Sequence, residues 1–399
     1  MNDINELFFS LIRVAIGTQD TLPYAPSAEE WKQLYDMAKK QSLVGICFAA
    51  LQKLTLQRNE NEYENENRIH SKDPEAKPAE YQDLEPCEVM AKYWNMPEML
   101  YLKWMGMAAK IQQRNEIVNK QCVELQKKLS AKGFRSSILK GQANHTHYGD
   151  DLAMQRQSGD IDIWVEGGRK KVVELVNSIC PTKEIRETHA QLHLFDDTEV
   201  EAHYRPGLIR DFRRNKRLQT FFQKNAEMCF CNKVKFACGE IVAPTVAFNA
   251  VQQLLHIYHH LFDSGIGLRQ VTDYYFVLRH LRSEEKEDVV KILKSVGVER
   301  FARALMYVQT EVFGIDNRFL LCEPSKMDGE YLLSEIMEAG NFGHHDSRRT
   351  HHERDSFIRS FFGVYFKNFR HARFAPMEWF WSPIWRLYYF GWRKVNGYH

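Results

Sequence analysis

Two aspartates separated by one apolar residue carry the strongest chemical signal in this chain. Asp160 and Asp162 stand in the run Ser-Gly-Asp-Ile-Asp-Ile-Trp-Val. Because side chains on a strand alternate with a period of two, both carboxylates project from one face while Ile161 and Ile163 enter the core on the other. Carboxylates this close repel each other unless a cation lies between them. Paired divalent metal ions about 3.5–4 Å apart do this in enzymes that displace groups at phosphorus, so the spacing predicts a metal-dependent phosphoryl-type active site.

A third carboxylate is expected from a later alternating segment, Glu199-Val-Glu201-Ala-His203. If this segment forms a strand beside the first, Glu201 or Glu199 approaches the two aspartates at the same edge. We select Glu201 because it lies closer to the centre of the strand, while Glu199 and the nearby Asp197 remain open alternatives. The expected role of Glu201 is to bind one metal ion and to accept the proton of an attacking hydroxyl.

A second group of residues is expected to bind phosphate. Lys140-Gly141-Gln142 falls at a predicted strand-to-helix turn, where Gly141 allows a phosphate to approach the backbone and the helix N-terminus favours negative charge. Lys140 supplies a point charge for a triphosphate, and Arg156 is the other candidate phosphate ligand. Ser158, two residues before the first aspartate, completes the predicted nucleotide-binding set.

The composition is that of a folded protein without a strong overall charge. The 399 residues carry a formal net charge of +2, from 54 basic and 52 acidic side chains, so no global attraction to nucleic acid or anionic lipid is indicated. Eight scattered cysteines predict free thiols in a reducing cytoplasm, and Cys229-x-Cys231 followed by Cys238 departs from the usual zinc spacing. No apolar run approaches the length of a membrane span, and the first residues lack the basic region of a signal peptide.

Helical periodicity dominates the first third of the chain. Apolar residues recur at helical spacing from Leu7 to Ala15, and Ser27-Ala-Glu-Glu30 predicts a capping box at the start of a second helix. Residues 58–86 are rich in Asn, Glu, Lys, Asp and Pro and predict an exposed or disordered insertion. A long helical stretch is expected from Ala91 to Lys132, ended by Gly133.

The candidate site residues fall in a central segment that mixes strands and helices, which predicts a compact α/β or α+β unit. Beyond Pro244 the pattern is almost wholly helical. We therefore expect an N-terminal helical region at 1–132, a catalytic core at 133–243 and a C-terminal helical domain at 244–399. Within the core, strands are expected at 135–139, 160–165, 184–188, 191–195 and 198–203, and helices at 143–148 and 169–178.

The order of these motifs resembles a known enzyme superfamily, the nucleotidyltransferases of the DNA polymerase β type. More narrowly, it resembles the bacterial group known as uncharacterised nucleotidyltransferases, over roughly residues 28–282. The pieces that carry the resemblance are, in order, Leu139-Lys-Gly141, Tyr148, Arg156, Asp160-Ile-Asp-Ile-Trp-Val165, Leu254-Leu-His-Ile-Tyr-His-His260 and Gly267-Leu-Arg-Gln-Val-Thr-Asp273.

The resemblance implies an α+β fold: an α/β nucleotidyltransferase core with a small mixed sheet, flanked by N-terminal helices and a mostly α-helical C-terminal region. It implies transfer of a nucleoside monophosphate from an NTP such as ATP to a hydroxyl acceptor, with release of pyrophosphate. Mg²⁺ or Mn²⁺ would be held by Asp160, Asp162 and Glu201. The acceptor would be a small molecule or a protein side chain, since the near-neutral charge argues against a long nucleic acid.

This chain departs from the superfamily at the phosphate turn. The superfamily usually shows Gly-Gly or Gly-Ser there, whereas this chain has Lys140-Gly141-Gln142. Because of this departure, the sequence indicates metal binding more strongly than NTP binding. It leaves one alternative open: a catalytically inactive nucleotide-binding or regulatory protein on the same scaffold.

Three further patterns have simpler explanations. His256 and His260 stand four apart on an expected helix, but Ile257 replaces the Glu of the zinc-protease motif, so a buried polar network with Arg269 and Asp273 is favoured. Contact of Arg269 with a nucleotide or acceptor is the alternative. A His- and Arg-rich run at 343–353 predicts a surface loop, and an aromatic run at 357–366 predicts a buried helix face. The aromatic run at 379–385 predicts a packed C-terminal element rather than a membrane-surface anchor.

Overall fold

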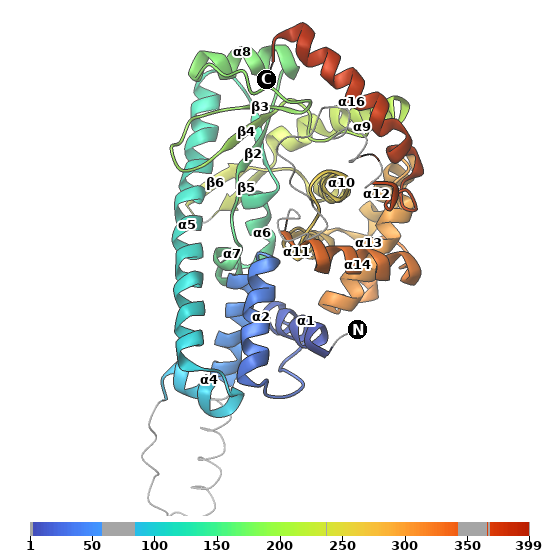
Figure 1. Ribbon diagram of the computed structural model, residues 1–399. Helices are drawn as coiled ribbons and strands as arrows, with labels where there is room; N and C mark the ends of the chain where they lie inside the picture. The colour runs from blue at the N-terminus through green and yellow to red at the C-terminus, as the bar shows by residue number, and fades with distance from the viewer. Residues whose placement is uncertain (1–2, 58–83, 237, 342–364, 366–367, 399) are drawn as a thin grey trace, which may run out of the picture.

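The computed structural model describes residues 3–57, 84–236, 238–341, 365 and 368–398. Two small sheets lie among many helices, which confirms the expected α+β class (Figure 1). The predicted insertion at 58–86 and the His-rich and aromatic runs at 343–353 and 357–366 lie almost wholly outside the described residues. No helix in the described part of the chain combines the length and the apolar character that crossing a membrane requires.

Helices form the N-terminal region, as the periodicity predicts. Ser27 caps the second helix, because its Oγ accepts a hydrogen bond from Glu30 N at 3.3 Å while the Glu30 carboxylate accepts one from Ser27 N at 2.7 Å. This confirms the predicted capping box. The elements are α1 (Asp3–Ile16), α2 (Ala28–Lys40), a helical segment at 44–57, α4 (Pro86–Trp94) and the long α5 (Glu98–Ala131).

A four-stranded sheet holds the predicted site. Its order is β1-β2-β4-β3, in which β2 and β4 are parallel and both edge pairs are antiparallel, so the sheet is mixed. The strands are β1 (Ser136–Leu139), β2 (Ile161–Val165), β3 (His189–Gln191) and β4 (Val200–His203).

Two strand predictions in this segment are wrong. The segment at 184–188 contributes only an isolated bridge between Ile185 and Ala190, and the segment at 191–195 leaves the sheet after Gln191. Leu192 N still donates to Val200 O of β4 at 2.8 Å, but Leu194 N bonds back to Leu192 O at 3.0 Å instead of to a neighbouring strand. Short strands of this kind depend on their partners rather than on their own residue pattern.

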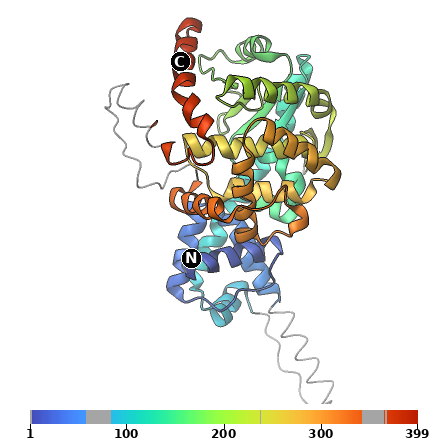
Figure 2. The ribbon, with the colours of Figure 1, turned by 90° about the vertical axis from the view of Figure 1, so that its right-hand side faces the viewer.

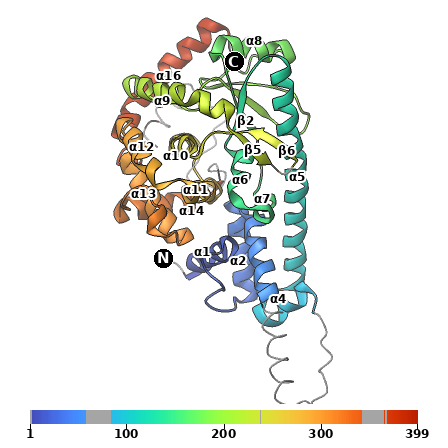
Figure 3. The same cartoon turned by 180° about the vertical axis from the view of Figure 1, so that it is seen from behind.

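Helices cover both faces of the sheet (Figures 1 and 3). Ile161, Ile163 and Val165 pack with apolar residues of α5 and of α8 (Gly168–Ile179), which confirms that the isoleucines of the Asp-Ile-Asp-Ile run enter the core. On the opposite face Trp164 stacks against Phe248 of α10 (Val246–Asp263), with ring centroids 5.4 Å apart. The two aspartates therefore point towards α10 and the C-terminal helices.

The chain between β1 and β2 is more helical than predicted. Instead of one helix at 143–148 and a following loop, it forms η1 (Gly141–Asn144), α6 (His145–Tyr148) and α7 (Asp150–Gln155). The segment before α10 contributes further elements that the residue pattern did not predict: α9 (Phe212–Cys231) and a hairpin of β5 (Lys233–Phe236) and β6 (Gly239–Val242).

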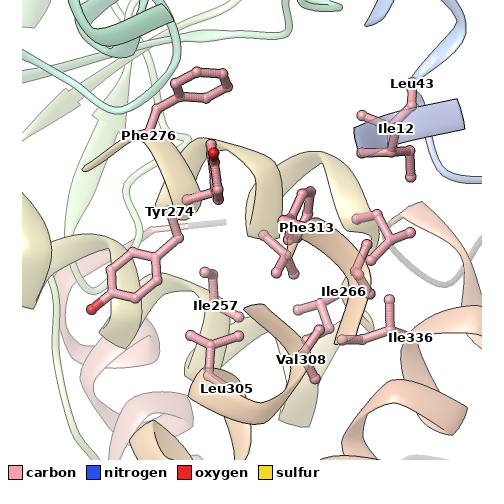
Figure 4. Packing of buried hydrophobic residues seen from close by; sticks show 14 of the residues in the cluster. Ile12, Leu43, Ile257, Ile266, Tyr274, Phe276, Leu305, Val308, Phe313 and Ile336 are labelled. Atoms are coloured by element: carbon pink, nitrogen blue, oxygen red, sulfur yellow. The ribbon is translucent and has the colours of Figure 1, made fainter. Parts of the chain in front are cut away.

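The described residues beyond Pro244 are almost wholly helical, as predicted. Figure 4 shows how Ile257, Tyr274, Leu305 and Phe313 from these helices pack together, with Ile12 of α1 nearby. The N-terminal helices and the C-terminal helices therefore share one hydrophobic core. Besides α10, the elements are α11 (Leu268–His280), α12 (Ser283–Ser295), α13 (Glu299–Phe313), η2 (Asn317–Phe319), α14 (Lys326–Ala339) and α16 (Pro376–Asn396).

The last helix, α16, packs by one side only (Figure 2). Trp385 is 5% exposed, lies 5.2 Å from Phe212 between ring centroids, and donates a hydrogen bond from Nε1 to Glu187 at 2.7 Å. Phe380 and Leu387 on the other side are 52% and 58% exposed. The predicted packed element is thus confirmed for the inner face of the helix.

A close helix contact supports the loop that leads into β2. Gly45 lies in the helical segment at 44–57, and a Cβ added to it would lie 2.1 Å from the backbone oxygen of Gln155 at the end of α7. We expect Gly45→Ala to lower the free energy of unfolding by about 1–3 kcal/mol, because backbone must move to relieve the overlap. Urea denaturation measures this loss.

The matched control is Gly106→Ala in α5, where a Cβ would meet nothing within 4 Å. Alanine favours a helix over glycine by about 1 kcal/mol, so this control is expected to stabilise the protein. Equal effects of the two substitutions would contradict the proposed steric contact.

Candidate active site

Three carboxylates meet at the end of the two central strands. The parallel register pairs Asp162 of β2 with Glu201 of β4, and Asp160 comes one residue before β2 begins. One carboxylate oxygen from each of the three residues lies within 4.8 Å of the others. The structure therefore brings Asp160, Asp162 and Glu201 together, as the spacing on the strands predicts.

The two alternative acids stand apart from this group. Glu199 is exposed just before β4, where its backbone oxygen accepts a hydrogen bond from Ile161 N at 2.9 Å. Asp197 forms an ion pair with Arg114 of α5 at 2.9 Å. Both residues line the same cavity as the three acids, but the strand register selects Glu201 as the neighbour of Asp162.

Two histidines that the sequence reasoning missed border the carboxylates. His203 Nε2 lies 2.7 Å from Asp162 Oδ1 and 3.1 Å from Glu201 Oε2, and His189 Nδ1 lies 3.3 Å from Glu201 Oε2. A signal for His203 was available, because the residue two positions after Glu201 shares its face of the strand. His189 is brought in by the antiparallel pairing of β3 with β4, which places it opposite His203.

The charges in this cluster are unevenly balanced. The charge of Asp162 and then burial raise the pKa of Asp160 to about 6. Burial alone would raise the pKa of Asp162, but the nearby Lys140 ammonium and His203 hold it well below its usual value. The pKa of Glu201 is also lowered, because its hydrogen bond with His203 outweighs the effect of burial. His203 has a pKa raised to about 9, since the two carboxylates outweigh its burial.

The predicted phosphate turn adjoins the acids directly. Lys140 follows β1 with φ at 45°, and Gly141 has φ at 40°, a region in which glycine is favoured. Lys140 Nζ lies 2.9 Å from Asp162 Oδ1 and donates to His256 Nδ1 of α10 at 3.2 Å. Burial and the Lys140 charge hold the pKa of His256 well below its usual value, so this ring is a neutral acceptor. Lys140 thus neutralises the charge of Asp162. A contact with phosphate would be a second role of the same ammonium group.

Two predicted nucleotide ligands, Arg156 and Gln142, form hydrogen bonds with other side chains of the protein. Arg156 Nε and Nη2 donate to the two carboxylate oxygens of Asp273 at 2.6 and 2.7 Å, and the Tyr148 hydroxyl donates to the same carboxylate at 2.6 Å. Gln142 donates from Nε2 to Asn119 Oδ1 of α5 at 2.8 Å and is 2% exposed. These internal partners mean that both side chains position the loop and the turn. Arg156 also lines the cavity over the acids, so phosphate binding by Arg156 and Gln142 stays a prediction.

A cavity of about 1190 Å³ lies over the acids. The three carboxylates, Gly141 and Ser158 line it on one side, and residues of α10 and α11 line it on the other. Its volume exceeds the usual range for a small-molecule site, so it has room for a nucleotide and part of a second substrate. Carboxylate oxygens are the ligands that Mg²⁺ and Mn²⁺ prefer, so the three clustered carboxylates fit a divalent metal site.

Comparison with known proteins agrees with this geometry. A family model described as uncharacterised nucleotidyltransferase matches residues 27–314, more than half of the chain. The chain belongs to this family. The matched region of this nucleotidyltransferase contains all three carboxylates, the turn at Lys140 and both α10 and α11. Among curated proteins and solved structures, no match to the chain was found.

Proposed function

We propose that this nucleotidyltransferase transfers a nucleoside monophosphate from an NTP to a hydroxyl acceptor in a reaction that depends on Mg²⁺ or Mn²⁺. The observation that carries the proposal is the meeting of Asp160, Asp162 and Glu201 within 4.8 Å at the floor of a large cavity. The family match supports nucleotidyl transfer in general. The identity of the metal, the nucleotide and the acceptor goes beyond the family match and is part of our proposal.

The three carboxylates would hold the metal ions. Divalent ions bound there supply Lewis-acid stabilisation of the charge on the transferred phosphate and on the leaving pyrophosphate. His203 supports the ligands by bridging Asp162 and Glu201, which orients both carboxylates. Lys140 and Gly141 form the wall next to Asp162, where a positive charge and an open backbone favour phosphate.

The transfer exchanges one bond to the α-phosphorus for another. The acceptor hydroxyl oxygen forms a bond to the α-phosphorus, and the bond from this phosphorus to the oxygen that bridges to the β-phosphate breaks. Pyrophosphate leaves with that oxygen, and Glu201, ionised because its pKa is lowered, accepts the hydroxyl proton. The acceptor is a small alcohol such as a sugar, or a protein side chain, for which the cavity has room.

The test is direct assay of the purified full chain. Each of the four labelled NTPs is incubated with Mg²⁺ or Mn²⁺ and with candidate acceptors, pyrophosphate release is measured, and acceptors and the protein itself are analysed by mass spectrometry. Metal-dependent pyrophosphate release with a mass increase of one nucleoside monophosphate on an acceptor supports the proposal. NTP binding without turnover under all conditions would favour the catalytically inactive regulatory protein instead.

A further inference from the structure

One wall of the cavity contains a buried arginine that lies against the loop preceding Asp160. Arg269, in the first turn of α11, is 8% exposed, and its Nη1 donates to Gln157 O at 3.0 Å. A Cβ added to Gly159 would lie 3.5 Å from the same Nη1 atom. The guanidinium of Arg269 therefore lies directly against the backbone that leads to the first metal-binding aspartate.

Two buried arginines lie close together here. Arg156 is paired with Asp273, which also accepts a hydrogen bond from the Tyr148 hydroxyl, while the charges of Asp273 and Asp160 favour the cationic form of Arg269. Burial, and then the charge of Arg156, lower the pKa of Arg269 to about 10. A buried guanidinium whose cationic form is disfavoured in this way is stabilised by an added anion.

Two neighbouring donors face the same cavity. Gln270 is 6% exposed, and its Oε1 accepts from Gly267 N at 3.1 Å, so its Nε2 is the donor end. Neither Gln270 Nε2 nor the buried Ser158 Oγ has a hydrogen-bond partner among the described residues. Both residues line the cavity together with Gly159 and Arg269. Buried donors without partners indicate a place that a hydrogen-bond acceptor occupies.

We propose that Ser158, Arg269 and Gln270 form an anion subsite beside Asp160 that binds the terminal phosphates of the nucleotide, the part that leaves as pyrophosphate. The inference rests on the proposed function. Lys140 is paired with Asp162, so its charge alone would not neutralise a polyphosphate, and the subsite supplies further groups that bind it. Arginine matches a phosphate with two parallel hydrogen bonds, and hydroxyl and amide donors complete its coordination.

The test measures binding of pyrophosphate itself by calorimetry, to the full chain with Mg²⁺ present. Arg269→Gln is expected to weaken pyrophosphate binding by about 10- to 100-fold, and Gln270→Leu and Ser158→Ala by smaller factors. The matched control is Arg279→Gln, from the same helix, whose Nη1 donates to the Tyr275 hydroxyl outside the cavity. This control is expected to bind pyrophosphate as the unaltered protein does.

The outcomes separate this inference from the proposed function. Loss of pyrophosphate affinity in Arg269→Gln and Gln270→Leu, with a normal control, supports the subsite even if no acceptor is ever modified. Unchanged affinity in both variants overturns the subsite even if the enzyme transfers nucleotides. Gln270→Leu and Ser158→Ala remove no charge, so they keep the test valid if Arg269→Gln fails to fold.

Discussion

Replacing Asp160 with asparagine is expected to reduce nucleotidyl transfer by at least about 100-fold while leaving the protein as stable as before or slightly more stable. Transfer is lost because one of three clustered carboxylates no longer carries a charge for the metal. Stability is retained because the raised pKa of Asp160 shows that its charge is disfavoured beside Asp162, although its side chain is partly open to the cavity. The gain is at most about 1 kcal/mol, since solvent screens exposed charges.

Two measurements check this result. Pyrophosphate release reports the loss of transfer, and thermal unfolding with and without Mn²⁺ reports metal binding, because a ligand that binds only the folded state raises the melting temperature. We expect Mn²⁺ to stabilise the unaltered protein and to have little effect on Asp160→Asn. Glu199→Gln is the matched control, because Glu199 lines the same cavity outside the carboxylate cluster and should retain activity and metal response. Full activity in Asp160→Asn would refute the site.

Removing the carboxylate of Asp273 should have the largest effect on stability. Asp273 is 5% exposed and accepts three hydrogen bonds, two from Arg156 and one from Tyr148. Asp273→Ala leaves the buried Arg156 guanidinium without its counterion. The nearby charge of Arg269 then repels it. Breaking a buried ion pair on one side costs about 3–5 kcal/mol, which urea denaturation will measure.

Two further variants test the cause of that loss. The double substitution Arg156→Met with Asp273→Leu removes both charges together, and it is expected to recover much of the stability. Asp316→Ala removes the partner of Arg318 in an ion pair whose side chains are 57% and 74% exposed, together with the cap hydrogen bond from Arg318 N at 2.9 Å, and it should cost about 1 kcal/mol. A loss for Asp273→Ala as small as for Asp316→Ala would show that the buried pair does not hold α11 to the loop before β2.

The sequence predicted the parts of this site that depend on local periodicity. The alternation in Asp160-Ile-Asp162-Ile places acids and core residues on opposite faces of any strand, and the structure buries Ile161 and Ile163 accordingly. The long helical stretches and the Ser27 capping box follow for the same reason, because helix and cap patterns involve residues within a few positions of one another. The short strands near 184–195 were predicted wrongly, because three-residue strands gain their stability from neighbours.

The sequence alone determined that two carboxylates share a strand face before a helical C-terminal region. Only the tertiary structure decided which other residues meet them. The parallel register of β2 with β4 selects Glu201 over Glu199 and pairs His203 with both acids. The antiparallel pairing of β1 with β2 brings Lys140 to Asp162. Packing of α11 near the loop before β2 joins Arg156 to Asp273, 117 positions away, and so gives a predicted phosphate ligand a buried internal partner. The physical reason is that strand register and buried ion pairs are long-range contacts, selected by the packing of the whole core and not by the spacing of residues along the chain.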